Sequence, residues 1–309
     1  MLIWYLYWTT ERIIFTKESR DTMDKQWIEQ LNIANIISIT PISGGDVNEA
    51  YKVDTSDEQY FLLVQRNRNS DFYAAEIAGL KQFEAAGIQA PIVIDYGQIT
   101  DDAYLLLSYL DEGIEGQQSD LARLVAKMHQ NKQPEGQFGF DLPYQGGDIT
   151  FDNAWSTQWQ DIFVKQRLDP LKDALVERGM WQTADIQQYE QVRAIINQSL
   201  AEHHSEPSLL HGDLWGGNHM FLTDGSPALF DPAPLYGDRE FDIGITMVFG
   251  AFNQSFYETY QQVLPLADGA ELRLEFYKLY LLMVHLLKFG GMYASSVERS
   301  MYKIIQAKA

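Results

Sequence analysis

Short apolar runs separated by turn residues dominate the first third of the chain. The runs are rich in β-branched and aromatic residues and are bounded by Gly, Asp or Ser, a pattern typical of strands. They cover residues 36–40, 50–53, 60–64, 92–94 and 103–108. Between the third and fourth runs, apolar residues recur at helical spacing from Phe72 to Ala86, and Gly87 comes next as a stop signal. The pattern predicts a sheet with one helix over the first 110 residues.

The rest of the chain has mostly helical periodicity. Amphipathic spacing predicts helices over residues 121–130, 153–168, 184–201 and 272–289. Residues 131–148 lack periodicity and are rich in Gly, Pro and Gln, so we expect a loop there. Sheet-forming and helical segments are thus segregated along the chain, which indicates an α+β fold.

Residues 1–22 differ from the rest of the chain, because an aromatic cluster precedes a charged run. A helix is expected from Met23, with Asp24 as its N-cap ahead of the apolar Trp27. We interpret Met23 as the natural start and residues 1–22 as an N-terminal extension. The alternative is a genuine N-terminal strand or a partner contact.

Composition narrows the classes of function. The 309 residues include no Cys, which excludes a disulfide framework, an iron–sulfur cluster and a thiolate zinc site. Lys and Arg number 23 against 43 Asp and Glu, a net charge of −20 that disfavours nucleic-acid and membrane-surface partners. A polyanionic ligand would need a divalent metal, backbone N–H groups or a few well-placed cations. The apolar N-terminus lacks a basic region and a small-residue cleavage site, so a cytoplasmic location is the default expectation.

An island dense in Asp, Gly and Pro interrupts the helical region over residues 209–241. It contains His211-Gly-Asp213-Leu-Trp-Gly-Gly-Asn218 and, thirteen residues after Asn218, Asp231. A hairpin is expected between these motifs, with residues 228–230 as its second strand and its turn at Asp224-Gly225. A His-Gly-Asp tripeptide alone is common in turns, whereas the ordered acid, amide and acid are specific. Phosphoryl transfer uses this set: one Asp orients the acceptor hydroxyl, and an Asn with a second Asp holds Mg²⁺.

A second candidate segment lies upstream, between two predicted strands. Gly44 and Gly45 let the backbone approach phosphates, and Ser43 or Asn48 can add a donor. Glu76, on the predicted helix, can brace a cation on the neighbouring strand, as the Lys–Glu pair of protein kinases does. The alternative for Glu76 is an exposed helix carboxylate.

Together with residues 76–80 and 236–242, these motifs resemble the fructosamine kinases (ketosamine-3-kinases) of the aminoglycoside-phosphotransferase-like kinase superfamily. The resemblance implies a bilobal protein-kinase-like fold. Its β-rich N-terminal lobe with one helix would span residues 23–110, and its mainly helical catalytic and substrate-binding lobe residues 111–309. It also implies ATP and Mg²⁺ as cofactors.

Site roles are implied by the same resemblance. Asp213 looks like the catalytic base, and Asn218 and Asp231 look like the magnesium ligands. The hinge that offers backbone groups to adenine corresponds to Ser108, Tyr109 and Leu110.

The substrate side is implied in the same way. Trp215 resembles the aromatic floor for a sugar-amine, and Asp238 and Glu240 line the substrate side. Asp242 is expected to anchor the catalytic loop, residues 211–218, rather than to touch substrate. For Trp155, core packing and substrate contact are both open.

One position departs from the family pattern. Gln65 stands where the family usually has a phosphate-binding lysine. Loss of a charge-assisted contact costs about 1.5–3 kcal/mol unless another cation compensates, and Arg66 and Arg68 are the candidates. Related sugar kinases carry a similar Gln-Arg pair and remain active.

The resemblance implies an ATP-dependent kinase that phosphorylates the 3-hydroxyl of ketosamines such as fructosamine or ribulosamine, free or on protein lysines, with deglycation as the result. Its partners would be a small sugar-amine and glycated protein. One alternative is a related kinase for an aminoglycoside, an aminoalcohol or another sugar. Another is a weakly active nucleotide-binding protein, which Gln65 suggests and the intact Asp213, Asn218 and Asp231 oppose.

Overall fold

The computed structural model describes residues 25–42, 48–146 and 149–308. Its contacts divide the chain into two units, residues 1–35 and residues 36–309. In the first unit, α2 (Lys25–Ile28) forms where a helix was expected. The predictions for residues 1–22, Met23 and Asp24 fall outside the described residues.

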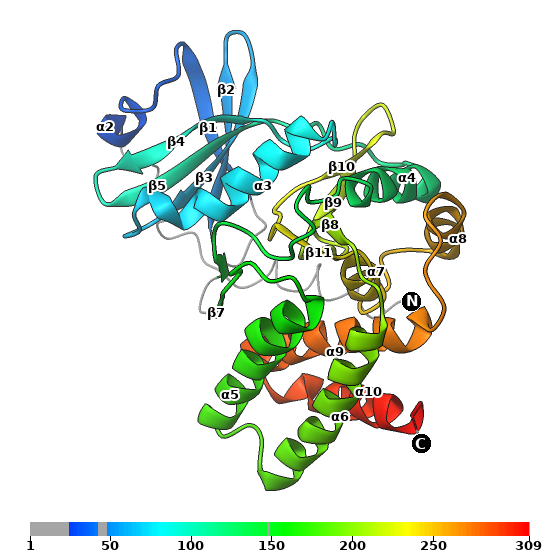
Figure 1. The fold of residues 1–309 in the computed structure, drawn as a ribbon. Helices are drawn as coiled ribbons and strands as arrows, with labels where there is room; N and C mark the ends of the chain where they lie inside the picture. The colour runs from blue at the N-terminus through cyan, green and yellow to red at the C-terminus, as the bar shows by residue number, and fades with distance from the viewer. Residues whose placement is uncertain (1–24, 43–47, 147–148, 309) are drawn as a thin grey trace. The chain divides into compact units, whose positions relative to one another are not determined.

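The second unit begins with a five-stranded antiparallel sheet (Figure 1), in the order β1-β2-β3-β5-β4. All five predicted strands are confirmed. Only the run at residues 92–94 is much longer than expected, because it continues to Ile99. The strands are β1 (Ile36–Ile42), β2 (Glu49–Thr55), β3 (Gln59–Gln65), β4 (Val93–Ile99) and β5 (Asp102–Ser108).

One helix covers part of this sheet, as the sequence predicts. A 3₁₀ turn, η2 (Ser70–Tyr73), leads into α3 (Ala74–Ala85), and Gly87 ends the helix with φ 64°. Ile77 and Leu80 of α3 belong to one buried cluster with residues of β5. The burial of this apolar face against the sheet fixes the orientation of the helix.

The opposite side of α3 approaches the island closely. A Cβ at Gly79 would lie 2.7 Å from Cγ of Pro234 and 3.0 Å from Cγ of Pro232. Only a glycine allows the helix so near to this segment. Glu76 lies one turn before Gly79, so the close approach brings its carboxylate toward Asp231.

The connection from the sheet to the helical region is held by backbone hydrogen bonds. The Gly113 N–H donates to the carbonyl of Phe221 at 2.7 Å, and the Thr223 N–H donates to the carbonyl of Asp111 at 3.0 Å. The lobe boundary predicted at residue 110 falls at the start of this connection, inside the second unit. It stays a prediction.

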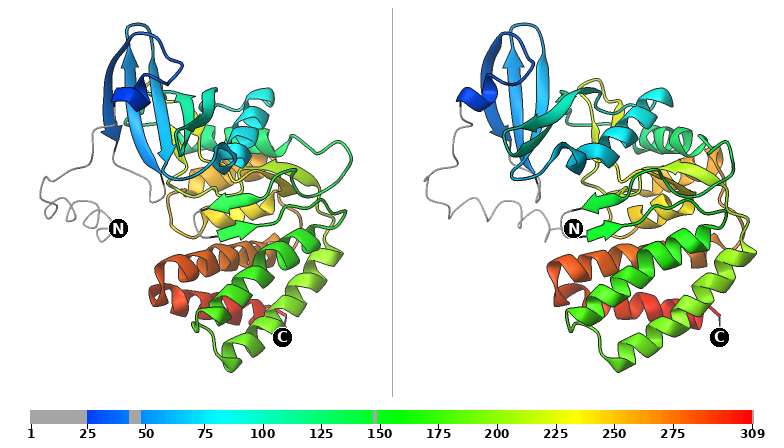
Figure 2. Two further views of the ribbon diagram at one scale, coloured as in Figure 1. Left: turned by 90° about the vertical axis from the view of Figure 1, so that its left-hand side faces the viewer. Right: turned by 60° about the vertical axis from the view of Figure 1, so that its left-hand side comes forward.

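The helical region contains a large aromatic and aliphatic core. Helices α5, α6, α9 and α10 lie side by side around it (Figure 2), with Phe163, Tyr189 and Phe276 fully buried. The helices are α4 (Gln118–His129), η3 (Asp161–Leu168, π-helical), α5 (Asp169–Glu177), α6 (Thr183–Glu202), α7 (Glu240–Thr246), α8 (Gln254–Val263), α9 (Ala270–Phe289), η4 (Gly291–Tyr293) and α10 (Ala294–Gln306). Within the described residues, no helix combines the length and apolar character that a membrane crossing needs.

Two expectations for this region are wrong. The helix predicted over residues 153–168 starts only at residue 159. Instead of joining a helix, Ser156 exchanges backbone hydrogen bonds of 2.8 Å with Phe138. The predicted loop over residues 131–148 contains β6 (Tyr144–Gly146), which pairs with β7 (Ile149–Phe151). These pairings depend on tertiary contacts that local periodicity does not report.

The contact at Gly79 gives a first prediction. In an open helix, Gly→Ala stabilises by roughly 0.5–1 kcal/mol, but the clash with Pro234 should make Gly79→Ala destabilising by about 1–2 kcal/mol. Urea unfolding measures the change. Gly291→Ala is the matched control, because a Cβ at Gly291 meets no heavy atom within 4 Å. A stabilised Gly79→Ala variant would contradict the close approach of α3.

Candidate active site

Two short antiparallel strand pairs carry the three predicted site residues. In one, β8 (Pro207–Leu210) pairs with β11 (Leu235–Asp238), and in the other β9 (His219–Phe221) pairs with β10 (Pro227–Leu229). The hairpin predicted around Asp224-Gly225 is therefore confirmed. Asp213 follows β8, Asn218 precedes β9 and Asp231 follows β10.

A buried histidine ties these segments together. Nε2 of His211 lies 2.9 Å from the carbonyl oxygen of Phe230, and the Asp213 N–H points to its Nδ1 at 3.3 Å. The carbonyl only accepts, so Nε2 carries the proton and Nδ1 is the acceptor. Burial lowers the pKa of His211 to about 4, which keeps the ring neutral and suits this arrangement. His211 thus links the catalytic loop to the residue preceding Asp231.

The backbone at this crossing leaves no space for a side chain. Gly212 has φ 81°, and a Cβ there would lie 1.8 Å from the carbonyl oxygen of Ala233. The Ala233 N–H donates to the carbonyl of His211 at 2.8 Å. Asp231 itself adopts the left-handed region with φ 55°, a conformation that Asp tolerates better than most residues. Two positive-φ residues therefore let the two segments turn beside each other.

Asn218 faces Asp213 directly. Its Nδ2 donates to the carbonyl oxygen of Asp213 at 2.8 Å and to Oδ2 of Asp213 at 3.2 Å. With the amide nitrogen committed to these contacts, the amide oxygen is the atom left to bind a hard cation.

The carboxylates of the site are held in an unfavourable electrostatic environment. Burial raises the pKa of Asp213 to about 7, and the charge of Asp231 adds to the rise. Burial also raises the pKa of Asp231 and that of Glu76, and the charge of Asp231 raises the pKa of Glu76 further. Lys288, near the end of α9, acts in the opposite direction on the pKa of both Asp213 and Asp231. Oxygen donors that are held near one another and repel one another fit a divalent cation such as Mg²⁺.

The candidate cations near β3 are engaged elsewhere. Arg66 donates to Glu49 at 2.9 Å and to Asp102 at 2.6 Å, so it cross-links the ends of β2, β3 and β5. Arg68 lies over the ring of Phe72, 5.9 Å from its centroid. These ion pairs occupy the guanidinium group of Arg66 and argue against it as the compensating cation.

Gln65 and Glu76 keep their expected elements without forming the expected pair. Gln65 ends β3, in phase with Leu63, whose side chain packs in the cluster beneath α3. Glu76 lies close to Asp231. A neutral residue at position 65 cannot form the ion pair of protein kinases, so Glu76 belongs to the acidic group instead.

A residue that sequence reasoning missed connects this acidic group to the upstream segment. The Tyr73 hydroxyl donates to Oδ1 of Asn48 at 3.0 Å, and its ring is fully buried. Burial raises the pKa of Tyr73, and the charges of Glu76 and Asp231 add to the rise. The sequence signal for this role was that Tyr73, an aromatic residue with a hydroxyl group, lies on the apolar face of the predicted helix, where a buried hydroxyl needs a hydrogen-bond partner. Ser43, Gly44 and Gly45, the predicted phosphate-binding residues, fall outside the described residues.

Two of the three backbone N–H groups of the predicted hinge are already hydrogen-bonded to the sheet or to the residue before it. The Ser108 N–H donates to the carbonyl of Ile92 at 2.8 Å, and the Tyr109 N–H donates to the carbonyl of Gln59 at 3.3 Å. Among the described residues, the Leu110 N–H has no hydrogen-bond partner. Of the three amides, that of Leu110 is therefore the one available to an adenine ring.

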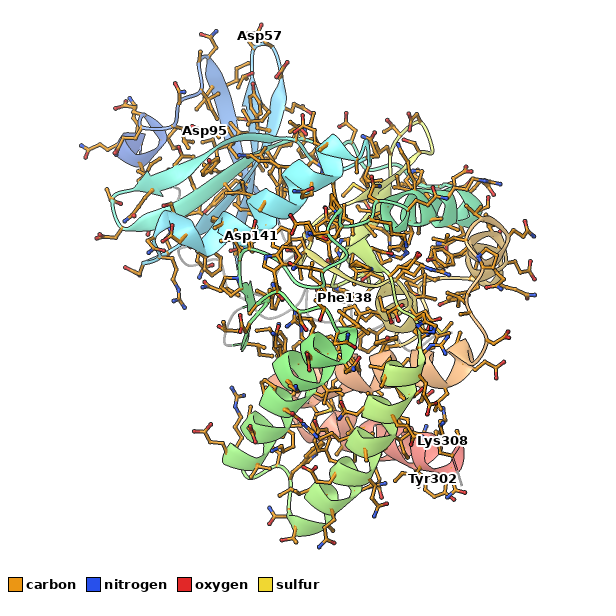
Figure 3. The ribbon with its side chains drawn as sticks, viewed as in Figure 1. Asp57, Asp95, Phe138, Asp141, Tyr302 and Lys308 are labelled. Carbon is orange, nitrogen blue, oxygen red and sulfur yellow. The ribbon has the colours of Figure 1, made fainter. Side chains whose placement is uncertain are left out.

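Two tryptophans stand partly exposed near the catalytic loop. Trp215 is 39% exposed and meets Phe249 edge to face, with 6.4 Å between ring centroids. Trp155 is 36% exposed and stacks on Tyr236 at 6.2 Å, and its Nε1 donates to Asp141 (labelled in Figure 3) at 2.9 Å. The exposure of Trp155 argues against the core-packing alternative.

Tyr144, in the segment predicted to be a loop, also belongs to this surface. Burial raises the pKa of its hydroxyl, and the charges of Asp213 and Asp231 contribute to the rise. The ring stacks on Phe151, with 6.0 Å between centroids. Sequence reasoning missed Tyr144 because its short strand exists only through pairing with β7.

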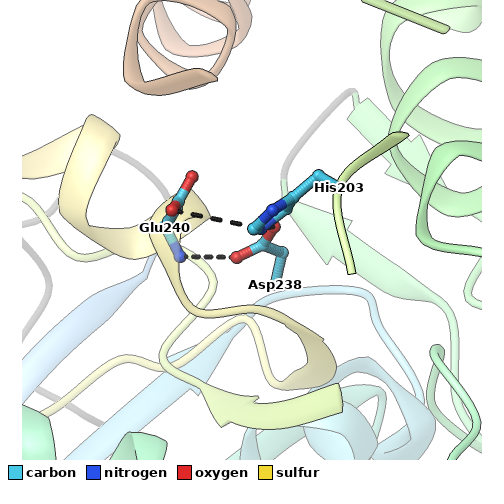
Figure 4. Close-up of side chains that lie close together, drawn as sticks. All are labelled: His203, Asp238 and Glu240. Atoms are coloured by element: carbon cyan, nitrogen blue, oxygen red, sulfur yellow. Dashed lines mark hydrogen bonds and ion pairs between the residues drawn. The ribbon is translucent and has the colours of Figure 1, made fainter. Parts of the chain in front are cut away.

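Asp238 and Glu240 lie in a buried network instead of an open surface. Oδ2 of Asp238 is 3.1 Å from Nε2 of His203 and accepts the Ser205 hydroxyl at 2.8 Å. Figure 4 shows His203 beside both carboxylates. Arg273 donates to both oxygens of Glu240, at 2.7 and 2.8 Å, so a cation already fills this cluster. These contacts favour a structural role for Asp238 and Glu240 instead of the predicted contact with substrate.

Asp242 anchors the catalytic loop, as predicted. Its Oδ2 accepts the His211 N–H at 2.7 Å and its Oδ1 accepts the Gly212 N–H at 2.9 Å. The carboxylate is fully buried. It therefore fixes the backbone immediately before Asp213.

Comparison with known proteins assigns this arrangement to a family. The fructosamine kinase family model matches residues 19–307. A probable ketoamine kinase of Staphylococcus aureus is 62% identical over 284 residues, which cover 92% of this chain and 99% of the relative. The chain belongs to the fructosamine kinase family.

Solved structures agree with this family assignment. A putative fructosamine-3-kinase from Haemophilus somnus has a TM-score of 0.78 at 26% identity, covering 87% of this chain and 92% of that one. An aminoglycoside phosphotransferase in ternary complex with AMP-PNP and hygromycin B has a TM-score of 0.66 at 16% identity, covering 94% and 99%. The kinase-like α+β fold is confirmed, and this member of the fructosamine kinase family is an ATP-dependent phosphotransferase.

The raised pKa of the partly buried Asp213 predicts a pH-dependent loss of stability in the metal-free protein. The folded state binds the proton of Asp213 more tightly than the unfolded state, so stability falls as pH rises from about 3.8 to about 7. Asp213→Asn removes this cost. Because the carboxylate keeps partial exposure, we expect a gain of only about 1–2 kcal/mol at pH 8 and little at pH 4.

Urea unfolding at the two pH values, without Mg²⁺, measures this gain. The control is Asp224→Asn. Hydrogen bonds from Ser226 lower the pKa of Asp224, so this change should not stabilise at pH 8. An equal gain for Asp213→Asn at both pH values would contradict the assigned charge state.

The hydroxyl of Tyr73 gives a separate prediction for the nucleotide. Tyr73→Phe keeps the buried ring but releases Asn48, so the KM for ATP should rise about 3- to 10-fold with kcat within twofold. Steady-state kinetics measure both constants. Tyr60→Phe, which removes a hydroxyl bonded to Glu58 on the same sheet, is the control and should leave both unchanged. If the Tyr73→Phe variant keeps the wild-type KM for ATP, Asn48 does not contribute to ATP binding.

Proposed function

We propose that the protein transfers the γ-phosphoryl group of Mg-ATP to the 3-hydroxyl of a ketosamine such as fructosamine or ribulosamine. The observation that carries the proposal is the convergence of Asp213, Asn218 and Asp231 at the ends of two antiparallel strand pairs that His211 and Asp242 hold together. Membership of the fructosamine kinase family supports the reaction class. The names of its relatives, a probable ketoamine kinase and a putative fructosamine-3-kinase, support the acceptor.

In this proposal Asn218 and Asp231 hold the metal through their side-chain oxygens. When bound, Mg²⁺ supplies neutralising charge for the phosphates. Glu76 lies close enough to Asp231 to help retain the cation. Gln65 hydrogen-bonds a phosphate but contributes no charge. The metal therefore neutralises a larger share of the negative charge of the phosphates.

Asp213 serves as the base for the acceptor hydroxyl. Its pKa near 7 lets the carboxylate accept a proton at neutral pH. Because His211 and Asp242 fix the backbone on its N-terminal side, little reorganisation is needed when the acceptor arrives.

The aromatic surface supports a sugar-amine acceptor. Trp215 and Trp155 offer ring faces to a sugar, and a protonated amine is attracted by aromatic rings and by nearby carboxylates. The partial exposure of both tryptophans is compatible with an acceptor carried on a protein lysine. Phosphorylation at the 3-hydroxyl makes the adduct unstable, so deglycation is the proposed outcome.

A turnover panel tests the proposal. ADP release should be at least tenfold higher in kcat/KM with ribulosamine or fructosamine than with an aminoglycoside. Asp213→Asn should lower kcat by about 10³-fold or more, because the base is lost. Asp224→Asn, the matched change at the turn between β9 and β10, should keep wild-type turnover. Preference for the aminoglycoside would overturn the ketosamine assignment.

A further inference from the structure

Two tyrosine hydroxyls near the catalytic loop have no hydrogen-bond partner in the part of the chain that the structure describes. One belongs to Tyr144, which begins β6, and the other to Tyr280, which lies in the middle of α9. Tyr280 is only 6% exposed. Folded proteins pair most of their buried hydroxyl groups, because an unpaired one has lost its hydrogen bonds to water without replacement. The hydroxyl of Tyr280 therefore indicates a partner that the chain itself does not supply.

Both tyrosine rings pack on the ring of Phe151 in β7. Tyr144 stacks on Phe151 with 6.0 Å between centroids, and Tyr280 lies at 5.9 Å in a tilted arrangement. The guanidinium group of Arg167 lies over the same ring, 4.9 Å from its centroid. Side chains from β6, η3 and α9 are therefore gathered around one aromatic ring, and each of them has a polar end.

Arg167 is held in place by groups other than the two tyrosines. Its Nη1 donates to the carbonyl of Asp152 at 2.7 Å, and its Nη2 donates to Oδ1 of Asn153. Both partners follow β7 directly in the chain. Arg167 thus fixes one side of the cluster and leaves both tyrosine hydroxyls unpaired.

Asp213 lies within electrostatic reach of both hydroxyls. Burial raises the pKa of Tyr280, the charge of Asp213 contributes to the rise, and the charge of Arg167 opposes it. Burial also raises the pKa of Tyr144, and Asp213 and Tyr280 both contribute to that rise. The unpaired hydroxyls therefore lie near the candidate base and near each other. A phenol hydroxyl both donates and accepts hydrogen bonds, which suits the hydroxyl groups of a sugar.

We propose that the hydroxyls of Tyr144 and Tyr280 bind hydroxyl groups of the acceptor sugar beside Asp213 and so select acceptors with several hydroxyls. This inference rests on the role of Asp213 given under Proposed function. Phenylalanine would fill the same space at both positions without an unpaired hydroxyl, so ring packing alone does not account for the two tyrosines. An acceptor that lacks the matching hydroxyls is rejected, because the tyrosine hydroxyls then stay unpaired in a site closed to water.

Two single substitutions that keep the rings test the proposed contacts. Tyr144→Phe and Tyr280→Phe should each raise the KM for fructosamine about 5- to 20-fold, because one hydrogen bond to the acceptor is lost. The KM for ATP should stay within twofold. Tyr277→Phe is the matched control on the same helix. The Tyr277 hydroxyl accepts Nε1 of Trp159 at 2.9 Å and donates to Asp238 at 3.3 Å, so its removal should leave the KM for fructosamine unchanged.

Urea unfolding without acceptor separates a binding role from a structural one. Tyr280→Phe should unfold at the same urea concentration as the wild-type protein or at a higher one, because it loses no hydrogen bond within the protein. Tyr277→Phe should unfold at a lower concentration, because its partners are left unpaired. A loss of stability in Tyr280→Phe equal to that in Tyr277→Phe would overturn the proposal. So would a wild-type KM for fructosamine in both Tyr144→Phe and Tyr280→Phe.

A binding measurement distinguishes failure of this proposal from failure of the proposed function. Calorimetry with fructosamine in the presence of AMP-PNP needs no turnover, and each variant should bind about 5- to 20-fold more weakly than the wild-type protein. If ketosamines are phosphorylated but Tyr144→Phe and Tyr280→Phe bind fructosamine as tightly as the wild-type protein, the proposed function stands and this proposal fails. If no ketosamine is phosphorylated, weaker binding by both variants still supports the two contacts, whereas equal binding or none to the wild-type protein overturns them.

Discussion

The structure depends on holding carboxylates together that repel one another. Asp213, Asp231 and Glu76 act on one another in one region, where desolvation raises all three pKa values and the charge of Asp231 raises those of Asp213 and Glu76 further. Such a group is unstable without either a cation or a rigid surrounding. The protein supplies the rigidity, and the proposed Mg²⁺ supplies the charge. This division explains why so much hydrogen bonding is concentrated on the backbone around the site.

That rigidity comes from hydrogen bonds to backbone groups rather than from ion pairs. His211 joins the Asp213 amide to the carbonyl before Asp231. Asp242 binds the two amides that precede Asp213, and His129 completes its shell of donors. Charged pairs are placed farther out, as in Arg273 with Glu240 and Arg66 with Glu49. A neutral imidazole fixes the geometry without adding charge beside these carboxylates, on which Lys288 already acts.

Several site residues could be predicted because their chemistry is local. His211 to Asn218 and Asp231 form a motif whose order and spacing indicate phosphoryl transfer, and the hairpin between them is set by Asp224-Gly225. The anchoring role of Asp242 followed from the family resemblance. The roles of Asp238 and Glu240 did not, because an acid near a catalytic loop looks the same in sequence whether it faces substrate or Arg273.

The sequence by itself determined the strands of the sheet, the helices α3, α4, α6 and α9 and the acid–amide–acid set, because these depend on periodicity, turn residues and spacing within short segments. Only the tertiary structure decided which residues meet across the chain. Tyr73 reaches Asn48, His129 reaches Asp242, and Arg66 is drawn to Glu49 and Asp102. Such partners are set by the packing of elements far apart in sequence, and a side chain's charge and hydrogen-bonding capacity do not reveal which partner it will find.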